Sequence, residues 1–252
     1  MRAIWTGTIG FGLVNIPIKI FSAIQNSQLD LDMLDRKDHA NIKFKRVNEK
    51  SGKEVAWENI VKGYLLKDKY VVLEDADFEE ALPEKTKSID LQTFVKEADI
   101  DSIYFDTPYY LEVQKGGEKA YTLLRKALEK TKMVGLGTFV MRTTENLAII
   151  RPYEGMLLLN KLRFEEEIRA SDELNIPNTR IGKGEMDMAI SLIEQHSSDF
   201  DISGYKNQYA TELLKIIKQK AKGKLASIRK LNVDKENTKA SELLAKLKAS
   251  LG

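Results

Sequence analysis

The first twenty residues, MRAIWTGTIGFGLVNIPIKI (residues 1–20), contain the pattern that decides the fold. From Val14 to Ile20 apolar residues alternate with polar ones, and this period of two is typical of a strand with one buried face. Pro17 has no N–H to donate to a ladder, which predicts an edge or a bend in this strand. The glycines at positions 7, 10 and 12 predict turns or bulges just before it. The chain therefore begins as β-structure.

More strand patterns follow along the chain to about residue 160. They lie at Ile42–Lys45, Tyr70–Leu73, Ser88–Val95, Tyr109–Val113, Thr138–Met141, Leu147–Ile150 and Met156–Leu159, with turn signals at residues 48–52, 144–146 and 154–155. Two helices are expected among them: a short one that Asp75 caps and Pro83 ends, and a longer one from Gly117 to Lys132 that Gly135 ends. Short strands at this spacing predict a barrel or a sandwich.

Beyond about residue 165 the apolar period changes from two to 3.6, which is typical of helices. Met186–Ile193 and Tyr205–Ile217 each carry an apolar helix face, and a final helix is expected over residues 239–251. We expect a mixed α/β, mainly β fold in three parts. These are a β core of residues 1–165, an α-helical arm of residues 166–222, and a basic C-terminal extension of residues 223–252 with a short helix.

Charge is unevenly spread, although the whole chain carries a net charge of only +2. Residues 206–252 carry a net charge of +8, and residues 1–205 carry −6. Such asymmetry is typical of a chain that touches a polyanion. No apolar run is long enough for a membrane span and the N-terminus lacks a signal-peptide layout, so we expect a cytoplasmic, nucleoid-associated protein without a membrane partner.

Motifs for catalysis are missing from the sequence. It has no cysteine, its two histidines, His39 and His196, are not in metal-ligand spacing, and it has no phosphate-binding loop or nucleophile elbow. Two acidic clusters, Asp30/Asp32/Asp35 and Glu165–Glu167, leave a metal-dependent nuclease open as an alternative, although a solvated face is several times more common. We expect no enzyme activity, no metal and no cofactor.

Basic residues within the folded segments are the candidates for binding. Such sites suit a sugar–phosphate backbone, because phosphate contact needs charge and reach but no base-edge matching. Backbone amides at the start of the helix after Gly117 could also receive a phosphate. The candidate nucleic-acid ligands are Lys43, Lys45, Arg46, Lys53, Lys62, Lys115, Lys119, Arg125, Arg142 and Arg151. The residues alone do not separate DNA from RNA, so an RNA-binding β-barrel stays open, as does a scaffold whose main partner is a protein.

Several stretches resemble the prokaryotic Ku proteins in order along about residues 1–220. They are RAIWTGTIGFGLVNIPIK (residues 2–19), FKRVN (44–48), IVKGY (60–64), YFDTPYYL (104–111), KGGEKAY (115–121), FVMR (139–142) and LRF (162–164). The resemblance implies an antiparallel β-barrel with a DNA-encircling bridge and a C-terminal helical arm.

The resemblance also implies a function. Two copies would form a ring that duplex DNA enters from a free end, so that selectivity for ends comes from topology and the bases are not read. The implied role is non-homologous end-joining repair of double-strand breaks. The implied partners are double-stranded DNA ends, a second copy of the chain as a homodimer, and DNA ligase D, which would be recruited through the C-terminal region.

Overall fold

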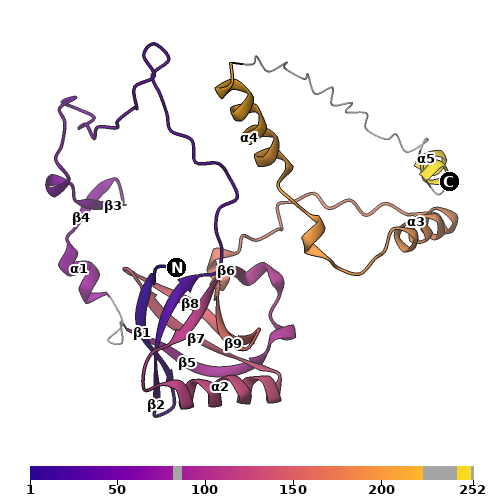
Figure 1. Ribbon diagram of the computed structural model, residues 1–252, viewed down its shortest axis with the longest axis horizontal. Helices are drawn as coiled ribbons and strands as arrows, with labels where there is room; N and C mark the ends of the chain where they lie inside the picture. Colours follow the sequence, from indigo (N-terminus) through magenta and orange to yellow (C-terminus); the bar gives the residue numbers. More distant parts are fainter. Residues whose placement is uncertain (82–86, 224–242, 251–252) are drawn as a thin grey trace. The chain divides into compact units, whose positions relative to one another are not determined.

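The computed structural model describes residues 1–81, 87–223 and 243–250. The chain divides into two compact units, one of residues 1–26 and 32–170 and the other of residues 27–31 and 171–252. The first unit contains a closed β-barrel, whose strands are interrupted along the chain by a long segment with a hairpin and a short helix, and the second unit is helical (Figure 1). The predicted three-part domain division stays a prediction.

Seven strands close the barrel in the order β1-β2-β6-β9-β8-β7-β5. They are β1 (Trp5–Phe11), β2 (Val14–Ser22), β5 (Ser88–Lys96), β6 (Phe105–Val113), β7 (Met133–Met141), β8 (Thr144–Tyr153) and β9 (Met156–Leu162). All neighbouring pairs are antiparallel except β1 and β5, which run parallel over three pairs, Thr8–Ser88 to Gly10–Asp90. The mainly β barrel is confirmed, and it differs from an all-antiparallel barrel only at this seam.

The core follows from the alternation that the sequence shows. Ile16, Ile18 and Ile20 of β2 are fully buried and pack with Ile9 of β1 and Leu159 of β9 in the main hydrophobic cluster. Side chains on one face of each strand therefore fill the barrel, as period two requires. A smaller cluster on the outer wall is built on Val134, Ile149 and Leu162. It packs against Ile100, which follows the 3₁₀ turn η2 (Glu97–Asp99), and against Tyr104 of the 3₁₀ turn η3 (Ser102–Tyr104).

Helix α2 (Glu118–Thr131) lies across one end of the barrel (Figure 1). Its Tyr121, Leu124 and Leu128 are buried in the main cluster and seal the barrel interior there. The Tyr121 hydroxyl donates a hydrogen bond to the Leu111 carbonyl and accepts one from the Leu157 N–H, both at 2.7 Å. It thereby joins β6 to β9 at the last pair of their ladder, Leu111–Leu157. Burial raises the pKa of this hydroxyl.

Between β2 and β5 the chain makes a long excursion, which we define as residues 23–87. It contains the 3₁₀ turn η1 (Trp57–Asn59), the two-stranded hairpin of β3 (Lys62–Leu66) and β4 (Lys69–Leu73), and the short helix α1 (Asp75–Glu80). After the barrel come the 3₁₀ turn η4 (Glu165–Glu167) and, in the second unit, α3 (Lys183–Gln195), η5 (Ile202–Gly204), α4 (Gln208–Ala221) and α5 (Leu243–Ser250). None of the helices within the described ranges has the length and apolarity that a membrane span needs.

Several local predictions are wrong. Residues 42–45 do not form a strand. Isolated bridges at Leu34–Asn41 and Val47–Glu54 flank them, and the Ile42 N–H donates to the Met33 carbonyl, but no neighbouring strand runs along these residues to extend the pairing into a ladder. Gly7 and Gly10 lie within β1, and of these glycines only Gly12, with φ of 58°, is in a turn. Pro17 lies in an interior strand of the barrel, one residue beyond the last β2–β6 pair, Ile18–Val113, where no partner needs its missing N–H.

Turns and helix ends also differ from the predictions in detail. The turn expected at residues 144–146 lies at Arg142–Thr143, because β8 already begins at Thr144. Helix α2 ends at Lys132, which adopts a left-handed conformation with φ of 57°, and Gly135 is inside β7. Helix α1 is capped by Glu74, one residue before the predicted cap. Pro83 and the first part of the predicted final helix, residues 239–242, lie outside the described residues.

A candidate nucleic-acid interface at one end of the barrel

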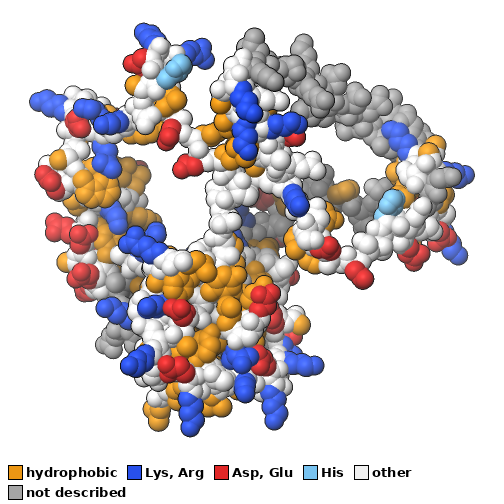
Figure 2. Space-filling view, viewed as in Figure 1, with side chains coloured by type: hydrophobic (Ala, Val, Ile, Leu, Met, Phe, Trp, Pro, Cys, Tyr) orange, Lys and Arg blue, Asp and Glu red, His pale blue; other side chains and the backbone are white. Residues whose placement is uncertain are grey.

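The excursion is exposed along its whole described length. No residue from Ile24 to Ala81 is buried, and large apolar side chains such as Phe44, Trp57 and Tyr70 are more than two-thirds exposed. Figure 2 shows hydrophobic side chains at the surface of this segment, with Lys and Arg among them. From residue 36 to residue 69 the excursion carries ten Lys and Arg against five Asp and Glu. This segment therefore presents both apolar surface and excess positive charge.

Four of the predicted ligands, Lys43, Lys45, Arg46 and Lys53, lie in or shortly before a tight turn at residues 48–53. The Asn48 side chain accepts hydrogen bonds from the amides of Lys50 and Ser51, and the Asn48 N–H donates to the Lys53 carbonyl. Across this turn Lys45 forms an ion pair with Glu54 at 2.6 Å, and the Arg46 guanidinium lies 4.5 Å from the centre of the Trp57 ring.

The four cations of this turn remain at the surface. Lys43, Lys45, Arg46 and Lys53 are all exposed, and the ion-paired Lys45 keeps 71% of its side-chain surface accessible. An exposed ion pair is worth little, so a phosphate can displace Glu54 from Lys45 at small cost.

Lys62 begins β3 and contacts helix α1. Its ammonium lies 4.3 Å from the centre of the Phe78 ring, a cation–π contact that joins the hairpin to the helix. Helix α1 and its cap are acidic, with Glu74, Asp75, Asp77, Glu79 and Glu80. Lys62 therefore lies at a boundary between basic and acidic surface.

Lys115 and Lys119 are exposed and flank the start of α2, as predicted. The backbone amide of Gly116, however, donates to the Glu118 carboxylate at 2.9 Å. The Glu118 carboxylate thus places a negative charge beside the start of the helix that was expected to receive a phosphate.

Arg125 and Arg151 are held by partners within the barrel unit. Arg125 forms an ion pair with Glu129 on α2, and only 19% of its side chain is accessible. Arg151 donates from Nε to the Asn160 Oδ1 at 2.9 Å and lies 3.4 Å from Glu97. It is an internal residue of β8, not its last residue as predicted. The side chains of both arginines are thus already engaged in contacts within the barrel unit.

Strand directions divide the barrel candidates between two ends. The exit end comprises the end of β2, the start of β5, the start of β6, the β7–β8 turn and the end of β9, so the excursion leaves and returns here and Arg142 lies here. The helix end comprises the β1–β2 and β8–β9 turns and α2, so Lys115 and Lys119 lie there. The predicted ligands in the barrel therefore do not form one surface.

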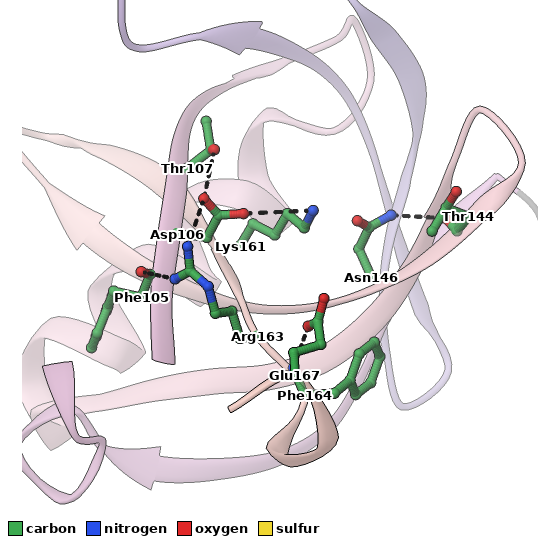
Figure 3. Close-up of polar contacts among 9 residues, drawn as sticks. All are labelled: Phe105, Asp106, Thr107, Thr144, Asn146, Lys161, Arg163, Phe164 and Glu167. Carbon is green, nitrogen blue, oxygen red and sulfur yellow. Dashed lines mark hydrogen bonds and ion pairs between the residues drawn. The ribbon is translucent and has the colours of Figure 1, made fainter. Parts of the chain in front are cut away.

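Two cations at the exit end were missed by the sequence prediction. Lys161, in β9, and Arg163, directly after it, both reach Asp106 of β6 (Figure 3), with ion-pair distances of 3.6 and 3.7 Å. Arg163 also donates to the Phe105 carbonyl at 2.7 Å, and the Thr107 hydroxyl lies 3.2 Å from the Asp106 carboxylate. The signal in the sequence was the alternation Asn160-Lys161-Leu162-Arg163, which puts two cations on one strand face.

The acidic clusters have local roles. The Asp35 carboxylate accepts a hydrogen bond from the Lys37 amide, and the Glu167 carboxylate accepts one from the Phe164 amide. In the part of the chain that the structure describes, no group of three or more His, Asp or Glu is arranged to hold a metal ion.

Comparison with known proteins adds a family to this geometry. The model of the Ku70/Ku80 beta-barrel domain matches residues 10–188. A relative from Coxiella burnetii named non-homologous end joining protein Ku is 36% identical over 257 residues, covering 99% of this chain and 94% of its own. Relatives of the same name from Archaeoglobus fulgidus and Bacillus subtilis are 38% and 34% identical, covering 100% and 90% of this chain and 98% and 75% of their own.

Among solved structures, the SPOC domain of human PHD-finger protein 3 matches 64% of this chain and 95% of its own at 14% identity, with a TM-score of 0.31. This weak likeness carries no inference. The family model covers most of the barrel and extends into α3, and the relatives cover nearly the whole chain. On this sequence evidence, and with the closed barrel and its long excursion in place, the chain belongs to the Ku family.

Proposed function

We propose that this protein binds the ends of double-stranded DNA without reading their sequence, as a ring-shaped homodimer, in non-homologous end joining. The observation that carries the proposal is the near full-length similarity to relatives named non-homologous end joining protein Ku. The protein would protect or bridge the ends and perform no chemistry on them.

The excursion supports this role because of its charge and exposure. Lys43, Lys45, Arg46, Lys53 and Lys62 line an exposed segment that leaves and returns at one end of the barrel. Contacts from such cations to phosphates fix a duplex but carry no sequence information. A segment of this kind, paired with its copy from a second chain, can surround a duplex, and a closed ring can load only where the duplex stops.

The hairpin β3–β4 supports the homodimer. Its ten residues leave none buried, and Tyr64, Leu65 and Tyr70 are each more than half exposed. An isolated two-stranded hairpin is only marginally stable in water, and contiguous exposed apolar surface marks an interaction site. A second copy of the chain would cover this surface. Light scattering during gel filtration should give twice the mass of one chain, and a monomer mass at micromolar concentration would contradict the homodimer.

Competition between DNA topologies tests the end binding. A labelled linear duplex bound to the protein is challenged with one plasmid, either linearised or as a covalently closed relaxed circle of equal mass. We expect the linear form to compete and the circle to fail, and linear DNA with both ends blocked by biotin and streptavidin should behave like the circle. Equal competition by the closed circle would refute threading. Equal competition by duplex RNA would favour an RNA-binding barrel.

Recruitment of DNA ligase D is the final element of the proposal, with the basic C-terminal region as its docking segment. The charge of residues 206–252, net +8, equally suits DNA, so the two roles must be measured separately. A chain that ends at residue 223 should bind DNA ends with little change but lose ligase binding. Loss of DNA binding with ligase binding intact would assign the segment to DNA.

A further inference from the structure

The interior face of the barrel changes character at the exit end. Leu157 and Leu159 of β9 are buried in the main core cluster, and the period of two places Lys161 and Arg163 on the same face one step further along. The β6–β9 register shifts between Phe105 and Pro108, and the residues of this irregularity include Asp106. Such irregularities commonly re-aim a side chain at the rim of a barrel. The apolar interior thus ends in a charged mouth, which we define as Asp106, Lys161 and Arg163.

The charged mouth has one cation more than it has carboxylates. Asp106 faces both Lys161 and Arg163 at 3.6 and 3.7 Å, distances that allow charge attraction but exceed a hydrogen bond. The three side chains keep between 31% and 40% of their surface accessible. Asp106 therefore orders the two cations without saturating their donors, and an additional anion can reach both.

The connectivity of the excursion decides what the charged mouth faces. Residue 23 leaves β2 at this end and hydrogen-bonds to Pro108, while the returning Ser88 pairs with Thr8 of β1. Under the proposed function, on which this inference rests, the excursion surrounds the duplex. The barrel end from which it leaves and to which it returns must then face the same duplex. The helix end faces away, because α2 closes it.

We propose that Lys161 and Arg163 bind a backbone phosphate of the DNA duplex at the exit end, with Asp106 as the internal counterion that orders them. Arg163, whose guanidinium is also fixed on the Phe105 carbonyl, presents a donor in a set direction. Lys161 supplies a mobile point charge beside it. The assignment adds two ligands that charge patterning missed and gives no phosphate contact to the helix end.

Two substitutions with opposite expected signs test the charged mouth. Lys161→Gln removes a cation and should weaken binding of a linear duplex about tenfold, and should lower the slope of log affinity against log salt by about 0.9. Asp106→Asn keeps an acceptor oxygen beside the two cations but removes the competing negative charge, and should tighten binding about two- to fivefold. General damage to the fold cannot explain a loss of DNA affinity in one variant and a gain in the other. Unchanged binding in either variant, with the urea midpoint intact, would overturn the assignment.

Controls separate this inference from the proposed function. The double variant Lys126→Gln/Lys130→Gln removes charge from exposed positions of α2 at the helix end, and should leave DNA affinity within about twofold. If the unmodified protein fails to prefer DNA ends, the proposed function fails. If it prefers ends but Lys161→Gln behaves like the control, only the charged-mouth assignment fails. The loss in Lys161→Gln should persist on duplexes without 5′-phosphates, and its disappearance there would overturn the backbone assignment in favour of the terminal phosphate.

Discussion

The two ends of the barrel differ in the side chains that close them, which are apolar at one end and charged at the other. At the helix end, α2 seals the interior with Tyr121, Leu124 and Leu128, and polar groups there are satisfied within the protein. At the exit end the interior face finishes in Asp106, Lys161 and Arg163, whose ion pairs are loose and partly exposed. One end buries its side chains in the core, and the other leaves charged side chains partly exposed.

This difference teaches that a count of cations does not identify a binding surface. Lys115, Lys119 and Arg125 are as numerous at the helix end as Arg142, Lys161 and Arg163 are at the exit end. They differ in what surrounds them, since Arg125 at the helix end has the Glu129 carboxylate to itself, whereas Lys161 and Arg163 at the exit end share the one carboxylate of Asp106. Substitutions at the two ends should therefore separate stability from DNA affinity.

Leu124→Ala should have the largest effect, and on stability alone. The Leu124 side chain is 2% exposed and belongs to the buried face of α2 that covers the barrel interior. Its loss should lower the free energy of unfolding by about 2–5 kcal/mol. Leu123→Ala, next to it but 67% exposed, should change stability by less than about 0.5 kcal/mol. Urea unfolding followed by circular dichroism checks both, and equal losses would mean that α2 does not seal the barrel.

Lys43→Glu/Lys45→Glu in the excursion should come next, with roughly a hundredfold loss of DNA affinity. The reason is the reversal of two charges that are proposed to contact phosphates, so AT-rich and GC-rich duplexes should lose affinity equally. Gel shifts on both duplexes measure this, beside Lys126→Glu/Lys130→Glu as a control with the same charge change at the helix end. A loss confined to one sequence would contradict backbone recognition.

Tyr121→Phe should lower the free energy of unfolding by about 1–3 kcal/mol, because the Leu111 carbonyl and the Leu157 N–H lose their buried partner. The pKa of Tyr121 is raised in the folded state, so its contribution is complete below the ordinary tyrosine pKa of 10.0. As the pH rises above that value, the difference between wild type and variant should shrink. Urea titrations at pH 8 and above pH 10 compare the two, and a constant difference would exclude this linkage.

Lys115→Gln/Lys119→Gln should have the smallest effect, less than about threefold on DNA affinity. Strands such as β6, with nine residues, separate the two barrel ends by about 20–25 Å after tilt, more than two Debye lengths of about 8 Å. The sequence alone predicted these lysines as ligands. A tenfold loss of DNA affinity in a gel shift would restore that prediction, and it would refute the inference that the helix end faces away from the duplex.

Periodicity predicted most of the barrel but not its closure. Alternation located β2, β5 and the β8–β9 hairpin, because one buried face leaves a period of two in the residues. The first half of β7 was missed, since Gly135 was interpreted as the end of the preceding helix. Gly137 is small because a Cβ there would lie 2.0 Å from the Asp90 carbonyl oxygen of β5, a constraint that only the neighbouring strand imposes.

The candidate site was predictable only where it is local in sequence. The cations of residues 43–62 form a visible cluster, although the strand expected at residues 42–45 is absent because no partner strand accompanies it. The alternation from Asn160 to Arg163 puts two cations on one strand face, but their counterion Asp106 lies more than fifty positions earlier, so the complete charged mouth follows only from the pairing of β6 with β9. The assignment of each cation to one end needed the strand order.

The return of the excursion to the end that it left has a consequence for how this family can diversify. To the barrel, residues 23–87 are a single loop between β2 and β5, and the entropy of closing a loop rises only by about 0.6 kcal/mol for each doubling of its length. Insertions, deletions or grafted modules in the excursion should therefore leave the barrel intact. Under the proposed function, changes in this loop could adapt the same barrel, by evolution or by protein engineering, to surround ligands of other diameters.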